Sequence, residues 1–383
     1  MKRALMTATV PSMIGQFNMN NIKLLQELGY KVDIACNFND YSVWNEERIN
    51  KFENELKELN IETFNISFSR SPKDIKNLVN SYKQMKQLLN EKKYIIVHTH
   101  TPISSFITRL AYKNSNLYET CKMIYTAHGF HFFKGNNPIK NFIFRNIEKI
   151  GAKYTDKLIT INKEDYEAAK KFKLKKNGTV EYVPGVGINI DKINSIQGNK
   201  KELCKELGIP TNSTLLLSVG ELNENKNHKI IIEALPKLSN NVHYIICGVG
   251  PLKEQYEQLA KKTNVSDRLH LLGYRTDIIK IMKSCDIFVF PSKREGLGLA
   301  AIEAMACGLP LITSNRHGIL DYAKNGVNAI TCNPFKCEDF KKAINDMNKE
   351  IRNKFSKINI INAKKYDFLH INKLMKKIYK EVI

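Results

Sequence analysis

Hydrophobic residues fall into short apolar runs that alternate with segments of helical periodicity along the whole chain. Runs of this kind, rich in β-branched and aromatic side chains, are typical of the buried strands of a parallel sheet. In the first half the runs are Arg3–Ala8, Lys31–Cys36, Ile61–Ile66, Tyr94–Thr99, Lys122–Thr126, Lys157–Ile161 and Thr179–Val183. In the second half they are Leu215–Val219, His243–Cys247, Leu269–Leu272, Ile287–Phe290, Leu311–Thr313 and Ala329–Cys332.

Helical periodicity fills the segments between these runs, and its regular alternation with strands predicts an α/β fold of two doubly wound, Rossmann-like domains. The predicted helices include Asn20–Leu28, Lys73–Lys92, Ser105–Tyr112, Lys229–Leu235, Leu252–Lys262 and Ala300–Ala306. A Pro/Gly cluster at Pro184–Gly187 precedes the point where the pattern restarts. We therefore expect an N-terminal domain over residues 1–187, a C-terminal domain over 188–365 and a final helix within 366–383.

Composition narrows the class of protein. The chain has 383 residues, 43% of them hydrophobic, which is enough for two packed cores. No apolar run approaches the ~20 residues of a membrane-spanning helix, and the N-terminal apolar run is too short for a signal peptide. Eight cysteines show no CxxC spacing, so a zinc site is not indicated and a reduced, cytoplasmic setting is expected.

Charge is the unusual part of the composition. The formal net charge is +22, with 29 Lys and Arg against 18 Asp and Glu in residues 1–190, and 31 against 20 in residues 191–383. The excess is therefore spread over both halves. A broad positive field attracts nucleotides, nucleic acids or an anionic membrane surface. A compositional bias toward lysine, visible also in the many Asn and Ile residues, explains it equally well.

The most informative segment is Phe288–Ile312, which reads FVFPSKREGLGLAAIEAMACGLPLI. An apolar strand ends at Pro291, a helix begins near Leu299, and two carboxylates, Glu295 and Glu303, stand in the loop and in the helix. The first amides of a helix lack intrahelical acceptors and lie at its positive end. This geometry suits an anionic diphosphate, with a carboxylate on each side to accept hydrogen bonds from hydroxyls.

The order EGLGLAAIEAMACGLP resembles the signature of the nucleotide-sugar glycosyltransferases of family 4, which are retaining enzymes of the GT-B fold. The resemblance implies that Glu295 contacts the donor sugar, that helix amides hold the diphosphate and that Glu303 accepts from the ribose. It also implies that the two domains face each other across a cleft and that the final helix packs back on the N-terminal domain. The donor-binding residues implied in this block are Gly296, Leu297, Gly298, Leu299 and Glu303.

The segment Ser218–His228 resembles the part of the family in which an Arg and a Lys neutralise the diphosphate. Lys226 matches the Lys, while Gly220 and Asn223 would lie beside the donor. The Arg position holds Glu221, which cannot donate to phosphate. Either Glu221 points away or another cation replaces the Arg, and the candidates are Arg275, Lys293 and Arg294.

Two further loops of the second half are similar to nucleotide-side loops of the family. Gly248 and Gly250 stand in a G-x-G-P turn after a predicted strand, although a tight turn before a helix has the same pattern. Arg275 follows the next strand and is expected to face base or phosphate, while Asp277 is expected to cap a helix over Ile278–Lys283.

In the first half, Gly15 stands in the segment Thr7–Phe17, which links the first strand to the first helix and would bring a helix N-terminus toward phosphate. His128 matches a family His that contacts the donor sugar, and neutral imidazole both donates and accepts toward hydroxyls. The spacing His128–His131 has no acidic partner that would indicate a metal.

An aromatic and basic cluster follows His128. It comprises Phe130, Phe132, Phe133, Lys134 and Arg145, with Lys140 nearby. Such a cluster suits a lipid-linked acceptor or an anionic membrane surface, although half of the phenylalanines are equally well explained as core residues. His98 and His100 share one face of a strand, and His100 is expected either at the acceptor or in the core.

These features together predict a retaining glycosyltransferase that moves a hexose or N-acetylhexosamine from a nucleotide sugar, most simply a UDP-sugar, to a lipid-linked saccharide. Capsular or extracellular polysaccharide synthesis, at the inner face of the cell membrane, is the expected setting. No metal or other cofactor is expected. An epimerase or hydrolase of the same fold is an alternative. A nucleic-acid-binding protein is another, but it predicts clustered cations and a binding motif, and neither is visible.

Overall fold

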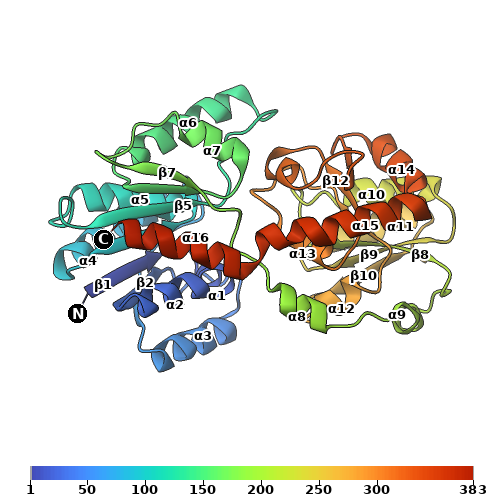
Figure 1. Ribbon diagram of the computed structural model, residues 1–383, viewed down its shortest axis with the longest axis horizontal. Helices are drawn as coiled ribbons and strands as arrows, with labels where there is room; N and C mark the ends of the chain where they lie inside the picture. Colours follow the sequence, from blue (N-terminus) through green and yellow to red (C-terminus); the bar gives the residue numbers. More distant parts are fainter. Residues whose placement is uncertain (1, 383) are drawn as a thin grey trace. The chain divides into compact units, whose positions relative to one another are not determined.

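The computed structural model describes residues 2–382, and within them the strands form two parallel sheets (Figure 1). The chain divides into two compact units. The first holds the residues up to Val186 together with the segment from Leu369, and the second is Gly187–Phe368. Inside the second unit, Ile188 donates to Tyr366 and accepts from Phe368, so the two ends of that unit lie side by side.

The first unit contains a seven-stranded sheet in the order β3-β2-β1-β4-β5-β6-β7, which is a doubly wound arrangement. Its strands are β1 (Lys2–Thr7), β2 (Tyr30–Cys36), β3 (Glu62–Asn65), β4 (Ile96–His100), β5 (Lys122–Ala127), β6 (Lys157–Thr160) and β7 (Thr179–Tyr182). Its helices are α1 (Pro11–Phe17), α2 (Met19–Glu27), α3 (Glu46–Glu58), α4 (Ile75–Glu91), α5 (Pro102–Lys113), α6 (Pro138–Ala152), α7 (Lys163–Ala169) and α16 (Phe368–Glu381), the last starting one residue before the boundary.

The second unit contains a six-stranded sheet in the order β10-β9-β8-β11-β12-β13. Its strands are β8 (Thr214–Val219), β9 (Val242–Cys247), β10 (Leu269–Gly273), β11 (Ile287–Phe290), β12 (Leu311–Ser314) and β13 (Ala329–Cys332). Its α-helices are α8 (Ile190–Ser195), α9 (Lys200–Leu207), α10 (Lys229–Ala234), α11 (Lys253–Lys262), α12 (Ile278–Met282), α13 (Leu299–Ala306), α14 (Cys337–Asp346) and α15 (Lys349–Ala363). Short 3₁₀ helices are η1 (Leu235–Lys237), η2 (His317–Asp321) and η3 (Lys364–Tyr366).

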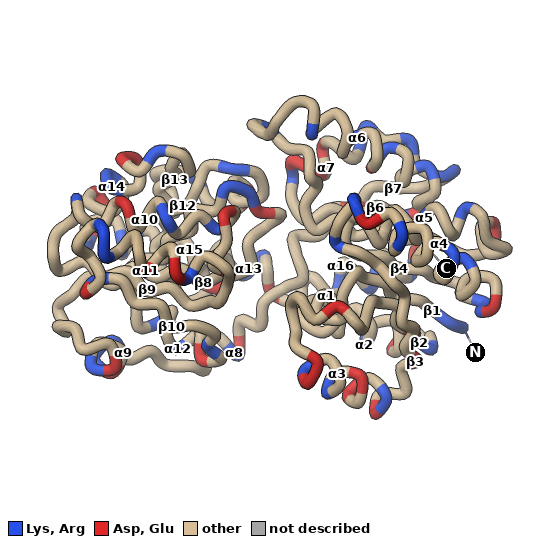
Figure 2. The backbone as a smooth tube through the Cα atoms, turned by 180° about the vertical axis from the view of Figure 1, so that it is seen from behind, with Lys and Arg blue, Asp and Glu red and all other residues tan. Residues whose placement is uncertain are grey.

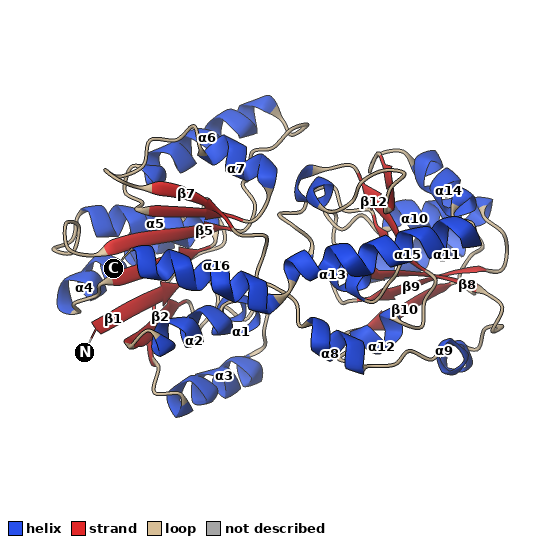
Figure 3. Ribbon diagram, viewed as in Figure 1, coloured by secondary structure: helices blue, strands red, loops and turns tan. Residues whose placement is uncertain are grey.

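Helices alternate with strands in both units (Figure 3), so the predicted α/β class is confirmed, and every predicted strand overlaps an observed one. The segment Thr7–Phe17 differs from expectation. It was predicted as a link before the first helix, but Pro11, with its fixed φ, already starts α1. Gly15 therefore lies inside a helix, where a Cβ would come within 2.5 Å of Trp44 Cη2.

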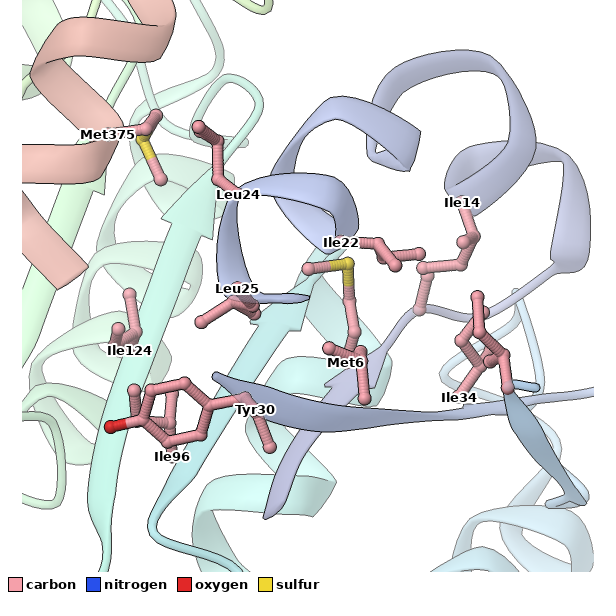
Figure 4. Close-up of a cluster of buried hydrophobic side chains, with 14 of the residues drawn as sticks. Met6, Ile14, Ile22, Leu24, Leu25, Tyr30, Ile34, Ile96, Ile124 and Met375 are labelled. Carbon is pink, nitrogen blue, oxygen red and sulfur yellow. The ribbon is translucent and has the colours of Figure 1, made fainter. Parts of the chain in front are cut away.

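The core of the first unit combines the sheet with helices from both ends of the chain (Figure 4). Met6, Ile34 and Ile124 from the strands are buried in one cluster with Met375 of α16. The buried residues of α16 are Ile371, Met375, Ile378 and Tyr379. Their i, i+4, i+7, i+8 spacing makes one apolar face of a helix.

Tyr379 of α16 also makes a specific polar contact, because its hydroxyl lies 2.8 Å from Nδ1 of His98. The other ring nitrogen of His98 lies 2.8 Å from Oγ1 of Thr126. His98 is thus a fully buried core residue with both nitrogens partnered. Burial lowers the pKa of its imidazole to about 3, so it stays neutral.

A buried ion pair fixes α6 to the rest of the first unit. Arg109 of α5 is fully buried and donates from Nη2 to Glu148 of α6 over 3.1 Å. Tyr125 donates to the other carboxylate oxygen over 3.0 Å, and the Arg109 guanidinium lies 4.1 Å from the Tyr125 ring centre. Gly151 gives the guanidinium its space, since a Cβ there would come within 2.5 Å of Cζ.

This pair generates a stability prediction. Glu148→Gln leaves the Arg109 charge buried without a counter-charge, and the free energy of unfolding should fall by roughly 3 kcal/mol, measured by urea denaturation of the whole chain. Lys170→Gln is the matched control, because Lys170 pairs with Glu167 at the surface, where the two side chains are 48% and 62% exposed. We expect no resolvable change in the free energy of unfolding there. Equal losses in the two variants would contradict a structural role for the buried pair.

Candidate active site

Strand-end loops of the second sheet touch each other through their backbones. Gly248, after β9, lies so close to the loop after β8 that an added Cβ would overlap the carbonyl oxygen of Gly220. Its amide donates to the Gly273 carbonyl over 2.8 Å, and Leu222 donates to Val249 over 3.0 Å. The G-x-G turn predicted from the sequence is thus a point where three loops pack together without side chains, and only glycine fits there.

The loop that carries Lys226 is shaped by asparagines. Oδ1 of Asn223 accepts from the Lys226 amide over 2.9 Å, three residues on, which is the kind of bond that an N-cap side chain makes. Asn227 has a φ of 58°, a left-handed conformation that Asn tolerates. Its side-chain amide donates to the carbonyls of Pro291 and Pro334, which ties this loop to the ends of β11 and β13.

Lys226 and Glu295 meet in this structure. Nζ of Lys226 lies 2.7 Å from Oε1 of Glu295, and the two side chains are 22% and 13% exposed. The ammonium also lies 5.2 Å from the centre of the Phe290 ring. Two residues predicted separately as catalytic, 69 positions apart, therefore form one partly buried ion pair beside an aromatic ring.

The backbone of Glu295 is bound by η2, a segment that the sequence analysis did not single out. Its carbonyl accepts from the Gly318 amide of η2 over 3.1 Å, and a Cβ on Gly318 would overlap the Gly296 carbonyl. The buried hydroxyl of Tyr322 has no partner among the described residues. Burial first, and the nearby Glu295 charge second, raise the pKa of Tyr322 well above its ordinary value. Only the glycine after His317 could have signalled this contact.

The start of α13 is set by Gly298. Its φ of 89° belongs to the left-handed region, and a Cβ would come within 2.6 Å of the Phe290 ring. Leu297 is buried, whereas Gly296, Gly298 and Leu299 are half-buried. Leu299 opens the helix four residues after Glu295, and the first amides of α13 lack intrahelical acceptors. Gly298 and Lys226 both lie against the Phe290 ring, so an anion at the helix start would be close to the Lys226 ammonium.

Glu303 lies in the middle of α13 and is half-buried. Burial raises the pKa of its carboxyl to about 7. No hydrogen bond or ion pair to this carboxyl is found within residues 2–382. A carboxylate that is desolvated and unpaired is prepared to accept from hydroxyl donors, as the ribose prediction requires.

The remaining donor-side predictions need adjustment. Glu221 is exposed and accepts from Asn223 Nδ2 over 2.8 Å, so it turns to its own loop rather than to a cation. Arg275 is bound by two carboxylates, bidentately by Asp277 and at 2.7 Å by Glu206. The prediction that Asp277 caps α12 with its side chain is wrong, because that carboxylate is engaged by Arg275. The prediction that Arg275 binds phosphate remains untested, and a phosphate would have to compete with these two carboxylates for the guanidinium.

In the first unit, His100 and His128 form a pair at the ends of β4 and β5. Nδ1 of His100 lies 3.1 Å from Nε2 of His128. Burial, reinforced by the neighbouring histidines, places the pKa of His100 well below its ordinary value, and burial alone lowers that of His128 to about 4. Both imidazoles are therefore neutral at pH 7 and able to donate and accept.

These two histidines line a pocket in the first unit. Its walls combine apolar groups with asparagines, from α1 and α2, the ends of β5 to β7, and α16. They include Phe17, Asn18, Asn20, Asn21, Thr126, Ile161, Val186, Ile371 and Asn372. Nε2 of His100 is buried and has no partner among the described residues. His100 is therefore a buried residue that also borders this pocket, and its contact with the acceptor stays a prediction.

The predicted aromatic cluster is corrected by the structure. Phe130 and Phe132 are 1% and 2% exposed and stack on each other at 4.8 Å within a buried cluster with Phe172. They cannot insert into a membrane. Arg145 is exposed and lies over the Phe132 ring at 5.1 Å, Lys134 is exposed, and Phe133 is half-buried. The local pattern of aromatic and basic residues did not reveal which rings face inward.

Two absences characterise residues 2–382. No helix there is long and apolar enough to cross a membrane. No group of three or more His, Cys, Asp or Glu within the same residues is arranged to hold a metal ion.

Comparison with known proteins decides the family. The family model for glycosyl transferases group 1 matches residues 199–365, and that for glycosyl transferase 4-like proteins matches residues 14–162. EpsD of Bacillus subtilis (strain 168), which is named as a glycosyltransferase, is 32% identical over 332 residues, 85% of this chain and 82% of EpsD. The chain belongs to the family 4 glycosyltransferases.

This glycosyltransferase has other similar relatives. The UDP-Gal:α-D-GlcNAc-diphosphoundecaprenol α-1,3-galactosyltransferase of Escherichia coli is 32% identical over 299 residues, 74% of this chain and 75% of that enzyme. A crystal structure of Anabaena Alr3699/HepE in complex with UDP and glucose matches 100% of both chains with a TM-score of 0.77 and 17% identity. The structural likeness confirms the predicted GT-B fold.

The raised pKa of Glu303 predicts how nucleotide binding by this glycosyltransferase depends on pH. A carboxyl with a pKa of about 7 is mostly ionised at pH 8 and mostly protonated at pH 6. Because two ribose hydroxyls need an acceptor, UDP affinity should fall roughly tenfold from pH 8 to pH 6, beyond any change caused by titration of UDP itself. Isothermal titration calorimetry at both pH values, with Glu303→Gln as reference, isolates the change in UDP affinity that is due to Glu303. Parallel pH profiles for wild type and Glu303→Gln would remove Glu303 from the ribose site.

Proposed function

We propose that this glycosyltransferase transfers a hexose or N-acetylhexosamine, with retention, from a UDP-sugar to a saccharide linked to undecaprenyl diphosphate. The observation that carries the donor half is the contact between Lys226 and Glu295 beside the first amides of α13. A cation and helix amides suit a diphosphate, and an adjacent carboxylate suits the hydroxyls of the sugar attached to it.

The Lys226–Glu295 pair resolves an electrostatic conflict in this site. A carboxylate at 4 Å from a phosphate is repelled by roughly 4 kcal/mol at an effective dielectric constant near 20. The Lys226 ammonium has three donors, so it keeps one on Glu295 and directs others at phosphate oxygens. Glu295 thereby reaches the sugar hydroxyls without repelling the diphosphate, and Glu221 needs no replacement cation at its position.

The chemistry follows from charge development on the leaving group. As the sugar–phosphate bond breaks, negative charge grows on the diphosphate, where Lys226 and the α13 amides stabilise it most strongly. The acceptor hydroxyl attacks from the face that the diphosphate leaves, and its proton passes to the departing phosphate oxygen. His128, neutral at pH 7, is proposed to hold the donor sugar by hydrogen bonds.

The acceptor half rests on two relatives. The Escherichia coli enzyme acts on α-D-GlcNAc-diphosphoundecaprenol. A Campylobacter jejuni subsp. jejuni (serotype O:2) relative, 27% identical over 66% of each chain, is an N,N'-diacetylbacillosaminyl-diphospho-undecaprenol α-1,3-N-acetylgalactosaminyltransferase. Such acceptors are anchored in a bilayer, which supports a peripheral location at the inner face of the cell membrane and a role in surface polysaccharide synthesis, such as capsule or exopolysaccharide.

The direct test is an assay of the purified chain with a panel of UDP-sugars and a synthetic GlcNAc-diphosphoundecaprenol analogue. We expect one UDP-sugar to give an α-linked, lipid-bound product, in EDTA as well as with added magnesium, because protein groups already neutralise the diphosphate. Free sugar alone, or an isomerised nucleotide sugar, would instead favour a hydrolase or an epimerase. Activity that disappears in EDTA and returns with a divalent metal would contradict the proposed phosphate site.

The ion pair predicts that substitutions of Lys226 and Glu295 have different effects on UDP binding and on turnover. Lys226→Ala should weaken UDP binding at least tenfold, because it removes a cation and leaves Glu295 to repel the diphosphate. Glu295→Gln should leave UDP binding unchanged or tighter, yet reduce turnover at least tenfold, a loss of ~1.4 kcal/mol of transition-state stabilisation. Calorimetry with UDP and steady-state rates with the donor found above measure the two effects.

Lys293→Ala is the matched control for Lys226. Lys293 belongs to the same region and pairs with exposed Glu224 at 3.1 Å, so its loss should change UDP affinity less than twofold. If Lys293→Ala weakens UDP binding strongly and Lys226→Ala weakens it little, Lys293 rather than Lys226 is the cation that binds the diphosphate. Weaker UDP binding in Glu295→Gln would refute the proposed repulsion.

A further inference from the structure

The solvent-facing side of α6 carries large apolar side chains. Ile139 is 70% exposed, Phe142 72%, Ile143 50% and Ile150 43%. At 100° per residue, these four positions fall within about one third of the helix circumference. A surface helix of a globular protein normally turns its polar side to water, so the pattern of α6 is reversed on this side.

The opposite side of α6 is fixed to the first unit and cannot rotate inward. Glu148, Gly151 and Ala152 are buried, and Glu148 is held by Arg109 and Tyr125. Asn137 caps the helix start by accepting from the amides of Ile139 and Lys140. The exposed apolar residues are therefore a permanent feature of the surface rather than a helix in the wrong orientation.

Cations surround this apolar side. They are Lys134, Lys140, Arg145, Lys149 and Lys153, all exposed. Figure 2 shows Lys and Arg positions, in blue, along α6. The one acid between residues 131 and 153 is Glu148, which is buried and paired with Arg109. Within the part of the chain that the structure describes, none of these five cations forms an ion pair with a carboxylate at 4.0 Å or less. The local field is thus positive and not neutralised by the protein itself.

We propose that this α6 surface, defined by Ile139, Phe142, Ile143, Ile150 and the five cations, docks the protein on an anionic lipid bilayer. Apolar side chains flanked by cations match the two layers of such a bilayer, acyl chains below and phosphate headgroups above. A second copy of this chain fits worse, because a face-to-face dimer brings ten uncompensated cations together. The helix has 15 residues and lies in the interface rather than across the membrane.

The inference deepens the proposed function and rests on it for the reason why a bilayer is needed. The loop from His128 to Asn137 connects the pocket histidine directly to the start of α6. A bilayer bound at α6 would hold this loop near the headgroups, where the diphosphate and first sugars of a lipid-linked acceptor lie. The docking surface is consequently assigned to acceptor capture.

Vesicle sedimentation of the full chain tests the surface. Wild type should bind vesicles of phosphatidylcholine with phosphatidylglycerol at low salt, and pure phosphatidylcholine or high salt should release most of it. Phe142→Ser/Ile143→Ser should lower the partition coefficient at least tenfold. Lys140→Gln/Lys149→Gln should lower it by a comparable factor, roughly fivefold per cation.

The matched control lies on α4 in the same unit. Ile75 and Val79 are 65% and 47% exposed, and Ile75→Ser/Val79→Ser removes two exposed apolar side chains without touching α6. This variant should bind vesicles as wild type does. Lys76→Gln/Lys83→Gln removes two positive charges from α4 and controls for the charge lost in Lys140→Gln/Lys149→Gln. It should also bind vesicles as wild type does. Equal losses in the α4 and α6 variants would overturn the assignment to α6.

Fluorescence gives a readout of depth. The chain has a single tryptophan, Trp44, so Phe142→Trp adds one reporter at the proposed surface. Brominated lipid in anionic vesicles should quench the emission of Phe142→Trp and leave that of wild type nearly unchanged. Quenching of wild type alone would mean that another face meets the bilayer.

Two outcomes separate this inference from the proposed function. If wild type transfers sugar from a UDP donor to the GlcNAc-diphosphoundecaprenol analogue but ignores anionic vesicles, the α6 surface is wrong and the function stands. Concentration-dependent dimers that Phe142→Ser/Ile143→Ser abolishes, without any vesicle binding, would assign the surface to a second copy instead. If vesicles bind through α6 but no UDP-sugar is used, the function fails and the surface stands.

Discussion

The proposed donor site depends on one constraint, which is that neighbouring strand-end loops of the second sheet approach backbone to backbone. Gly248 packs on the carbonyl of Gly220, and Gly318 packs on that of Gly296. A side chain at either glycine would push the loops apart. Because Lys226 follows the first of these contacts and Glu295 adjoins the second, their 2.7 Å separation is a consequence of loop packing rather than of the ion pair itself.

The ion pair is accordingly better understood as a functional device than as a source of stability. Partly buried charges lose hydration, and their mutual attraction does little more than offset that loss. An ammonium that already sits beside a carboxylate is, however, in place before the substrate arrives, so no reorganisation is needed when charge develops on the leaving group. The loops that hold the ammonium in place are ordered by their glycine contacts, so their conformational entropy is already lost before the substrate binds.

Local sequence predicted the strands and the α/β class, because strand runs and glycine turns are determined over a few neighbouring residues. It also singled out Lys226 and Glu295, which the structure brings within 2.7 Å of each other. It failed where burial depends on distant partners. Phe130 and Phe132 sit in a basic, aromatic segment, yet Phe172 covers them. Asp277 looked like a helix cap, but Arg275 occupies its carboxylate. Gly15 looked like a loop residue, but Pro11 starts the helix earlier. Nothing in the local sequence marked Asn227, although its left-handed backbone and two carbonyl contacts build the Lys226 loop.

The same limit applies to the net charge of +22, which is uninformative as a total. Many cations of the second unit are paired within it, among them Arg275, Lys280 and Lys293. Those of α6 are not paired, and they frame apolar residues instead of carboxylates. A cation that the protein leaves uncompensated keeps its field for a partner, whereas a paired cation loses most of it within a few ångströms. Where each charge finds its counter-charge, rather than how many charges there are, therefore separates compositional bias from a binding surface.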